Sequence, residues 1–383
     1  MSIYLDYNAS TPIDFRVLDF MIDVYKNNIG NPDSRTHDYG AQARSTVENA
    51  RKSVASLLDV APSEVFFTSG ATESNNIAIQ GLQAYANQNG KNHIITTSIE
   101  HKAVLETVKE MERRGFEVDI LDPLPSGRID PKQVLEKVKN STLLVCVMHV
   151  NNETGIIQPV KELGIELEKR NVLFHVDATQ SCGKLVKELR EIKYNTLSFS
   201  AHKLRGPQGV GVLVLRRRAY QLPPVRAIMF GGQQENGIRP GTIPVALVAG
   251  CGKACEIAER EYRENALKNK EIKLALIQLL ETSGLSYSFN GDQNYCIDST
   301  ANICIPGVSS EALMLATKAY CSISNGSACT SKSYDPSYVL HAMRIPIEQI
   351  DCSIRISWGY DTDIVEFRQN LEKLLDMAKM LAS

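Results

Sequence analysis

The stretch Ser200-Ala201-His202-Lys203-Leu204-Arg205-Gly206-Pro207-Gln208-Gly209 guides the interpretation of the whole chain. Lys203 lies between a short β-like run, 196–199, and a glycine-rich turn, with Ser200 and His202 just before it. A lysine in this setting can carry a Schiff base, and the hydroxyl and imidazole beside it are suitable donors for a phosphate group. Because a lysine before a turn is more often an ordinary surface residue, this interpretation needs support from elsewhere in the chain.

That support is an acidic residue, Asp177, which closes the apolar run 172–176. Gln180 follows it in the next turn. A pyridoxal phosphate enzyme needs a lysine for the Schiff base and an acidic partner for the ring nitrogen of the cofactor. Lys203 and Asp177 together therefore predict pyridoxal 5'-phosphate as the cofactor.

Length and composition are those of an ordinary globular protein. The chain has 383 residues, of which 43% are hydrophobic and 22% charged, so it can bury a large core in two domains or in one large α/β unit. The formal net charge of −2 gives no general electrostatic reason to expect direct binding to nucleic acid or to a membrane. No apolar run approaches the ~18 residues of a membrane span, and residues 1–8 do not resemble a signal peptide.

Nine cysteines are scattered along the chain. Their odd number and spacing fit neither a disulfide framework nor a metal site, so we expect no metal ion and a reducing, cytoplasmic location. Cys329 differs from the others because small and polar residues surround it in the segment 325–333. We expect an exposed loop there, with Lys332 favouring the nucleophilic thiolate form of Cys329.

Strand-like and helix-like segments alternate from about residue 41 to residue 243. The strand-like runs are apolar throughout, which is typical of a mostly parallel sheet with helices on both faces. They number seven: 64–68, 93–97, 116–121, 143–150, 172–176, 196–199 and 210–215. The helix-like segments between them include 73–87, 101–114, 131–139 and 160–169.

The pattern changes after residue 244. A long helix-like region reaches about residue 280, short strands follow at 301–305, 319–323 and 353–358, and an amphipathic helix covers 364–381. We therefore predict an α/β fold with a seven-stranded, mostly parallel sheet, together with a smaller α+β domain. The large domain is expected over 16–255, and the small domain over 1–15 and 256–383.

The residues Gly70, Ala71 and Thr72 connect a strand to the start of a helix. Backbone N–H groups and the helix dipole make such a helix start a phosphate site. Ordinary helix capping would also explain these residues. Nucleotide binding is a weaker alternative, because the lysine of a P-loop is missing.

Other chemically capable side chains fall just past strands. His101 could stack on a flat cofactor and exchange protons, and Asn152 follows the buried run 143–150. Open α/β sheets build their sites at the carboxyl ends of their strands, so we expect these residues to converge with Asp177 and Lys203. Arg355 lies in the small domain, where its guanidinium could bind a substrate carboxylate.

These motifs, taken in order, resemble the cysteine desulfurases, which belong to the class V aminotransferase family of fold-type I pyridoxal phosphate enzymes. The resemblance runs nearly from end to end of the chain. The matching segments are 4–9, 31–37, 68–74, 150–153, 176–180, 200–203, 239–242 and 326–331. The last of these is similar to the long-loop branch of NifS-like and IscS-like enzymes.

The resemblance implies a fold-type I homodimer with two active sites near the subunit interface. The residues implied to hold the phosphate are Gly70, Ala71, Thr72, Ser200 and His202, with Thr242 reaching in from the partner subunit. The resemblance also assigns Asp177 to the ring nitrogen of the cofactor, Gln180 to its phenolic oxygen, and His101 to stacking on the ring.

The implied substrate is L-cysteine, whose carboxylate is held by Arg355. Asn152 is implied to bind both the substrate and the cofactor. The catalytic residues implied are Lys203, as the base for the Cα proton, His101, in later proton transfers, and Cys329, which takes up the sulfur as a persulfide. L-Alanine would be released, and the sulfur would pass to an acceptor protein.

Three questions stay open at this point. A selenocysteine lyase or a cysteine-independent lyase is the nearest alternative activity, and Cys329 argues against it. A non-catalytic interaction platform would share the fold, but it would have no need of Lys203, Asp177 and Cys329. The acceptor could be an iron–sulfur scaffold, a tRNA-thiolation relay or a DNA-modification protein, and the segment 34–37 resembles desulfurases that serve DNA phosphorothioation.

Overall fold

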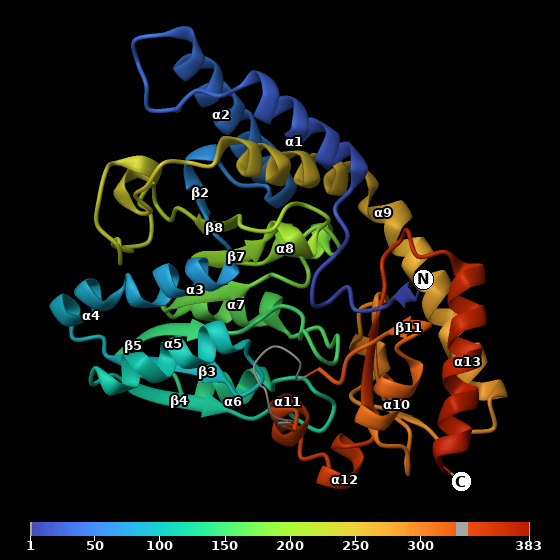
Figure 1. Cartoon of the computed structure of the whole chain (residues 1–383). Coiled ribbons are helices and arrows are strands. Elements are labelled where there is room, and N and C mark those ends of the chain that lie inside the picture. The colour runs from blue at the N-terminus through green and yellow to red at the C-terminus, as the bar shows by residue number, and fades with distance from the viewer. Residues whose placement is uncertain (1, 327–335, 383) are drawn as a thin grey trace.

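The computed structural model describes residues 2–326 and 336–382 (Figure 1). A seven-stranded sheet lies at its centre, in the order β2-β8-β7-β6-β5-β3-β4. Its strands are β2 (Val65–Thr68), β3 (His93–Thr97), β4 (Glu117–Leu121), β5 (Thr142–Cys146), β6 (Leu173–Asp177), β7 (Thr196–Ser200) and β8 (Gly211–Leu215). Strands β4, β3, β5, β6 and β7 run parallel, whereas β8 and β2 join the edge beyond β7 in antiparallel pairs. The predicted α/β architecture is therefore confirmed.

Helices cover both faces of this sheet. One face packs on α3 (Ala71–Gln80), α4 (Gln83–Asn89) and α5 (Lys102–Arg113). The other face packs on α2 (Asp38–Leu58), α6 (Pro131–Glu136), α7 (Val160–Lys169) and α8 (Val186–Glu191), and on the first half of α9 (Val245–Thr282). Apolar strands sandwiched in this way bury both of their faces, which explains why their sequences do not alternate.

The single helix expected over 73–87 is divided into α3 and α4, and Gly81 lies at the break. A Cβ atom at Gly81 would lie 2.5 Å from the carbonyl oxygen of Ile77 and 2.6 Å from that of Arg226. The segment around Arg226 therefore packs directly on the backbone at this point. Hydrophobic spacing carries no signal for such a backbone contact, so the sequence pattern missed the break.

The smaller unit has its own sheet and core. Its elements are a three-stranded antiparallel sheet of β9 (Ser288–Phe289), β10 (Thr300–Cys304) and β12 (Ser353–Ser357), a parallel pair of β1 (Ile3–Tyr4) with β11 (Cys321–Ser322), and the helices α10 (Ser310–Thr317) and α13 (Ile364–Ala382). Ile3 and Leu5 belong to its core. The start of the chain therefore packs with the last third of the sequence.

Three helices connect the smaller unit to the large one. Helix α9 packs beside α1 (Phe15–Asn27) and α2 with its first half, and beside α13 with its second half (Figure 1). Helices α11 (Tyr338–Ala342) and α12 (Ile347–Ile350) contribute Leu340 and Ile350 to the core of the large unit. The division into 16–255 and the remainder stays a prediction, since α9 is continuous across residue 255.

Candidate active site

The amine of Lys203 is held by the backbone near the start of the chain. Lys203 ends a short 3-10 turn, Ala201–Lys203, directly after β7. Its Nζ donates to the carbonyl oxygens of Asn8 and Ala9, the latter at 2.6 Å. The Nε2 of Gln180 donates to the same Asn8 oxygen at 2.9 Å. The segment 8–9 therefore brings together two predicted site residues that are distant from it in sequence.

Asp177 ends β6 as a buried carboxylate. Its Oδ1 accepts from the Thr179 N–H at 2.9 Å, and its Oδ2 accepts from Nδ2 of Asn75 at 2.8 Å. Asn75 is fully buried on α3. The sequence analysis did not select this residue, because nothing in its local pattern distinguishes it from other polar residues in the first turns of a helix.

The oxygen of Asn75 continues this network away from Asp177. It accepts from the Ser198 hydroxyl and lies 2.9 Å from Nε2 of His175. Burial lowers the pKa of His175 to about 4, so the ring is neutral and its Nε2–H donates to Asn75. Its Nδ1 then accepts from the Thr196 hydroxyl, 2.8 Å away. Thr196 thus donates to His175, His175 donates to Asn75, and Asn75 donates to Asp177. This chain of neutral donors stabilises the negative charge of Asp177.

The start of α3 lies beside the end of β7. The N–H of Ala71 donates to Ser200 Oγ at 2.7 Å. Among the described residues, the N–H groups of Thr72 and Glu73 have no acceptor. A Cβ atom at Gly211 would lie 2.5 Å from the Cα of Gly70, so these two backbones touch. Open N–H groups at the start of a ten-residue helix suit an anion such as a phosphate.

His101 caps α5 and is largely enclosed by the site. Its Nδ1 accepts from the N–H of Ala103 at 3.1 Å. Burial lowers its pKa, with Lys203 adding to the effect and Asp177 opposing it, so the three side chains share one electrostatic environment. The ring is therefore neutral near pH 7 with its proton on Nε2. A pocket of about 440 Å³ between α3 and α5 is lined by His101 and Thr72.

His202 and Thr242 are the other two residues predicted to bind the phosphate. His202 has its Nδ1 3.2 Å from the Ser10 hydroxyl, and burial together with Lys203 lowers its pKa to about 4. Thr242 is exposed, and no described residue of the site forms a hydrogen bond with it. The contact expected of Thr242 in a partner subunit stays a prediction.

Arg355 lies on β12 with its side chain buried. Its Nη1 donates to the backbone oxygen of Asn152 at 3.0 Å, and its Nη2 pairs with the Asp6 carboxylate at 2.6 Å. The sequence analysis did not predict Asp6 as a partner. The Nε of Arg355 has no partner among the described residues.

Several buried polar atoms gather at this site without a hydrogen-bond partner in the described part of the chain. They are Asn152 Oδ1, Gln180 Oε1, Thr179 Oγ1, His149 Nδ1 and Arg355 Nε. A buried polar group without a partner is costly and uncommon. Their concentration beside Lys203 and Asp177 fits a bound group and a substrate that bring polar atoms of their own. The residues present are therefore compatible with pyridoxal phosphate.

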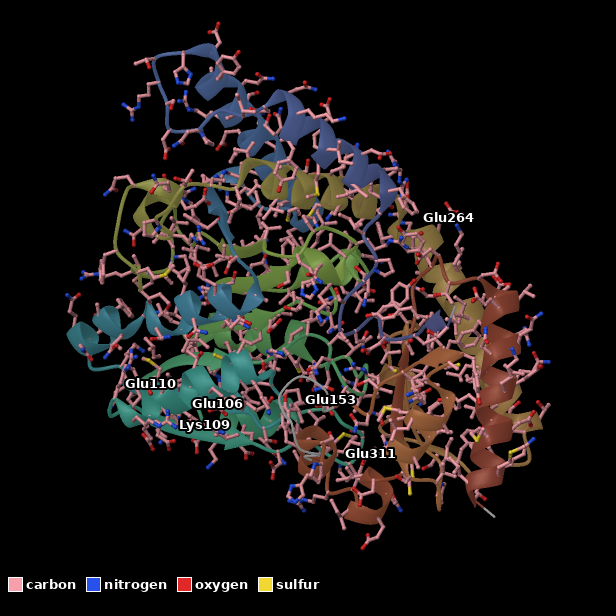
Figure 2. All side chains as sticks on the ribbon, viewed as in Figure 1. Glu106, Lys109, Glu110, Glu153, Glu264 and Glu311 are labelled. Carbon is pink, nitrogen blue, oxygen red and sulfur yellow. The ribbon has the colours of Figure 1, made fainter. Side chains whose placement is uncertain are left out.

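Glu153 marks the place where the cysteine segment joins the site. It is buried near the packing of the large unit on the smaller one (Figure 2), and its Oε2 accepts from the Ser337 hydroxyl. Gly326, at φ 89°, approaches the same carboxylate so closely that a Cβ atom there would lie 2.7 Å from Oε2. The chain on both sides of 327–335 is thus fixed at Glu153. Cys329 itself lies outside the described residues.

The chain is similar to known proteins over nearly its whole length. The family model for class-V aminotransferases matches residues 3–367. A cysteine desulfurase IscS of Vibrio cholerae is 42% identical over 379 residues, covering 97% of this chain and 91% of that protein. A NifS-like protein of known structure has a TM-score of 0.90 and 35% identity, covering 99% of this chain and 100% of its own. The structure of DndA from Streptomyces lividans has a TM-score of 0.81 and 42% identity, covering 92% and 98%.

Proposed function

Because the chain belongs to the class-V aminotransferases, and within them to the cysteine desulfurases, we propose that its site converts L-cysteine to L-alanine with pyridoxal 5'-phosphate and takes the sulfur as a persulfide on Cys329. The observation that carries this proposal is the meeting of Lys203, Gln180 and the start of the chain at one carbonyl oxygen, that of Asn8. The charges of Asp177 and Lys203 both influence the pKa of His101.

The cofactor would be held at its two ends by different elements. The residues proposed for the phosphate are Gly70, Ala71, Thr72, Ser200 and His202, with Thr242 of a second subunit. Asp177 would bind the ring nitrogen, and the donors around its carboxylate, Asn75 and the Thr179 N–H, would hold it in place. The unpartnered oxygens of Gln180 and Asn152 lie at this site, where a bound group could satisfy them.

Arg355 would hold the carboxylate of the substrate. Its guanidinium is fixed by Asp6 and by the backbone of Asn152, and its Nε is unpartnered. A guanidinium restrained in this way presents a directed donor to an incoming carboxylate. Asp6 would compete with that carboxylate for Nη2 and would hold Arg355 in place before the substrate arrives.

When bound, pyridoxal phosphate supplies an electron sink that makes the Cα proton of the substrate removable. The Lys203 amine would take that proton, and neutral His101, whose Nε2 carries a hydrogen, could then act as a hydrogen-bond donor in the later proton transfers. The thiolate of Cys329 would attack the substrate sulfur, so that an S–S bond forms as the C–S bond breaks. The persulfide would then pass to an acceptor protein.

The partners proposed are a second copy of this chain and a sulfur acceptor. The dimer is supported by the exposed position of Thr242, in a motif that the family uses across the interface. The acceptor would be an iron–sulfur scaffold, a thiolation relay or a DNA-modification protein. The likeness of segment 34–37 to phosphorothioation desulfurases, and the similarity to DndA, direct the first acceptor assays to DNA-modification proteins.

The decisive experiment mixes the purified protein with L-cysteine and a reductant, and measures alanine and sulfide. Cys329→Ala should abolish both products while the visible absorbance of the lysine-linked cofactor is retained. A lyase that does not need a cysteine would keep forming alanine in this variant. A protein without the visible band, even after incubation with pyridoxal phosphate, would be a platform rather than an enzyme.

A further inference from the structure

A cavity of about 170 Å³ lies where residues from the start of the chain, helix α9 and the small domain meet. Its walls are mostly apolar, and the side chains that form them include Val17, Leu204, Ile257 and Trp358. An engineered cavity of about 150 Å³ in another protein is large enough to bind benzene. This cavity can therefore hold a small organic molecule.

Charged side chains also line the cavity, and nearly all of them are already paired. Those with an ion-pair partner are Asp14 with Arg16 at 2.7 Å, Arg205 with Asp361, and Asp298 with Lys273 at 3.8 Å. Lys203 reaches the cavity wall as well, and its amine donates to two backbone carbonyls. Opposite charges therefore balance Asp14, Arg205 and Asp298. The Lys203 amine is bonded to neutral oxygens, and Nε of Arg205 has no hydrogen-bond partner among the described residues.

Lys184 is the exception. Among the described residues its side-chain amine forms no hydrogen bond and no ion pair, although Lys184 lines the same cavity. Protein surrounds it closely, and burial together with the charge of Lys203 lowers its pKa to about 8, so the amine is still protonated at neutral pH. It nevertheless keeps some accessible surface, and as a cavity-lining residue it can present this surface to a ligand. A half-buried cation that protein largely surrounds, and that has no charged partner, can gain from pairing with an anion.

We propose that this cavity is a binding site for a small monocarboxylate, whose carboxylate pairs with Lys184 and whose hydrocarbon part contacts the apolar walls. A dicarboxylate or a phosphate would bring more negative charge than one lysine balances, and would place it against apolar side chains. A neutral molecule would leave Lys184 without a partner. The site does not depend on the proposed chemistry, because the residues that form it, apart from Lys203, take no part in that chemistry.

The test uses the purified holoenzyme, with sodium benzoate and sodium hexanoate as probes in calorimetry and thermal unfolding. Both probes should bind and raise the unfolding temperature, since a ligand that binds only the folded state stabilises it. Lys184→Met removes the charge and nearly keeps the volume, and it should weaken binding by about 10-fold or more. Lys187→Met, at an exposed lysine on α8, should bind as the wild type does. Benzyl alcohol should bind weakly and equally to both variants.

Two further variants separate this site from the substrate site and guard against misfolding. Arg355→Ala should keep its affinity for benzoate, whereas Ala258→Leu, which adds a larger side chain to a wall of the cavity, should lose it. No binding to the wild type would overturn the proposal, and so would equal affinity in Lys184→Met. Loss of binding in Arg355→Ala alone would place the probe at the substrate site and would also overturn it. None of these readouts is turnover, so the result is independent of desulfurase activity.

Discussion

The site can be compared across its two walls, one around Asp177 and one around Arg355. In the Asp177 wall, made of Asp177, Asn75 and His175, the side chains bond to one another in a continuous network. The Arg355 wall consists of Arg355, Asp6 and Asn152. There the guanidinium has one unpartnered nitrogen, and the amide oxygen of Asn152 is unpartnered too.

This difference separates two tasks. A group that must keep one charge state is best surrounded by partners that do not titrate near neutral pH, and the Asp177 wall has this property because burial keeps His175 neutral. A group that must receive a substrate needs bonding capacity to spare, and the Arg355 wall retains it. The contrast predicts that changes in the two walls affect different steps.

The largest effect is expected in the Arg355 wall. Arg355→Ala should lower kcat/KM for L-cysteine by about 10³-fold, mostly through KM, because charge-assisted bonds to the substrate carboxylate are lost. Steady-state kinetics show whether the loss lies in KM or in kcat, and the visible spectrum shows whether the cofactor is still bound. Arg355→Lys should recover part of the loss, and exposed Arg113→Ala is the neutral control. A fall in kcat with unchanged KM would contradict the division between the walls.

The Asp177 wall should respond in the opposite way. Asn75→Leu removes one of the two hydrogen-bond partners of Asp177 and one of the two of His175, which costs about 1–3 kcal/mol per group in the free energy of unfolding. We expect weaker cofactor binding and a pH-dependent visible spectrum, with KM for L-cysteine nearly unchanged. Denaturant unfolding of the apoprotein and cofactor titration measure these effects. Asn87→Leu, at an exposed position on the neighbouring helix α4, should be silent. An unaltered affinity for the cofactor in Asn75→Leu would remove the network from the mechanism.

Glu100, beside His101, is a carboxyl in a third environment. Its Oε1 accepts from Thr97 and from the N–H of Met148, while its Oε2 is unpartnered. Burial raises the pKa of Glu100 from an ordinary 4.5 to about 8. The folded chain thus keeps a proton between these values that the unfolded chain loses, so this residue reduces stability as pH rises through that window.

Glu100→Gln should remove that loss. Relative to the wild type, the variant should become more stable by roughly 2–4 kcal/mol as pH increases from about 5 to 9. Denaturant unfolding at several pH values measures the difference, and Glu106→Gln on the exposed side of α5 (Figure 2) is the control. A difference that does not depend on pH would mean that Glu100 is ionised in the folded protein.

The smallest effect concerns Glu153, which holds the chain on both sides of the cysteine segment. Glu153→Gln keeps the size of the side chain but weakens its bond from Ser337. We expect persulfide formation to slow by about threefold to tenfold, since the amide offers one acceptor oxygen where the carboxyl group offers two, with the cofactor spectrum unchanged. Exposed Glu311→Gln (Figure 2) should behave as the wild type does. Single-turnover assays decide, and an altered spectrum would show that Glu153 acts on the cofactor instead.

The sequence was most informative where function depends on residue identity at the end of an apolar run. Lys203, Asp177 and Gln180 follow strands, and β3 and α7 have the predicted bounds. It was least informative where the backbone supplies the contact. The carbonyls of Asn8 and Ala9, which hold the Lys203 amine, could belong to any residue type, so no pattern points to them.

The sequence pattern also did not predict the residues that bond to the predicted site residues from distant parts of the chain. Asn75 and Asp6 resemble ordinary polar residues in their local sequence, and only the packing of distant segments gives them a role. The run expected as a strand over 143–150 ends earlier, at Cys146, because the chain beyond it turns to present His149 and Asn152 to the site. Apolar composition could not separate the strand from that buried turn.

The union of the first residues with the last third of the chain has a consequence for biogenesis. Asp6 and Arg355 are separated by 349 positions, and Asn8 and Thr300 by 292. Ribosomes add about 5–20 residues per second, so the opening segment must wait on the order of a minute before its partners emerge. Asp6 and Asn8 can therefore meet these partners only after nearly the whole polypeptide has been synthesised, so the Arg355 wall is completed late in biosynthesis.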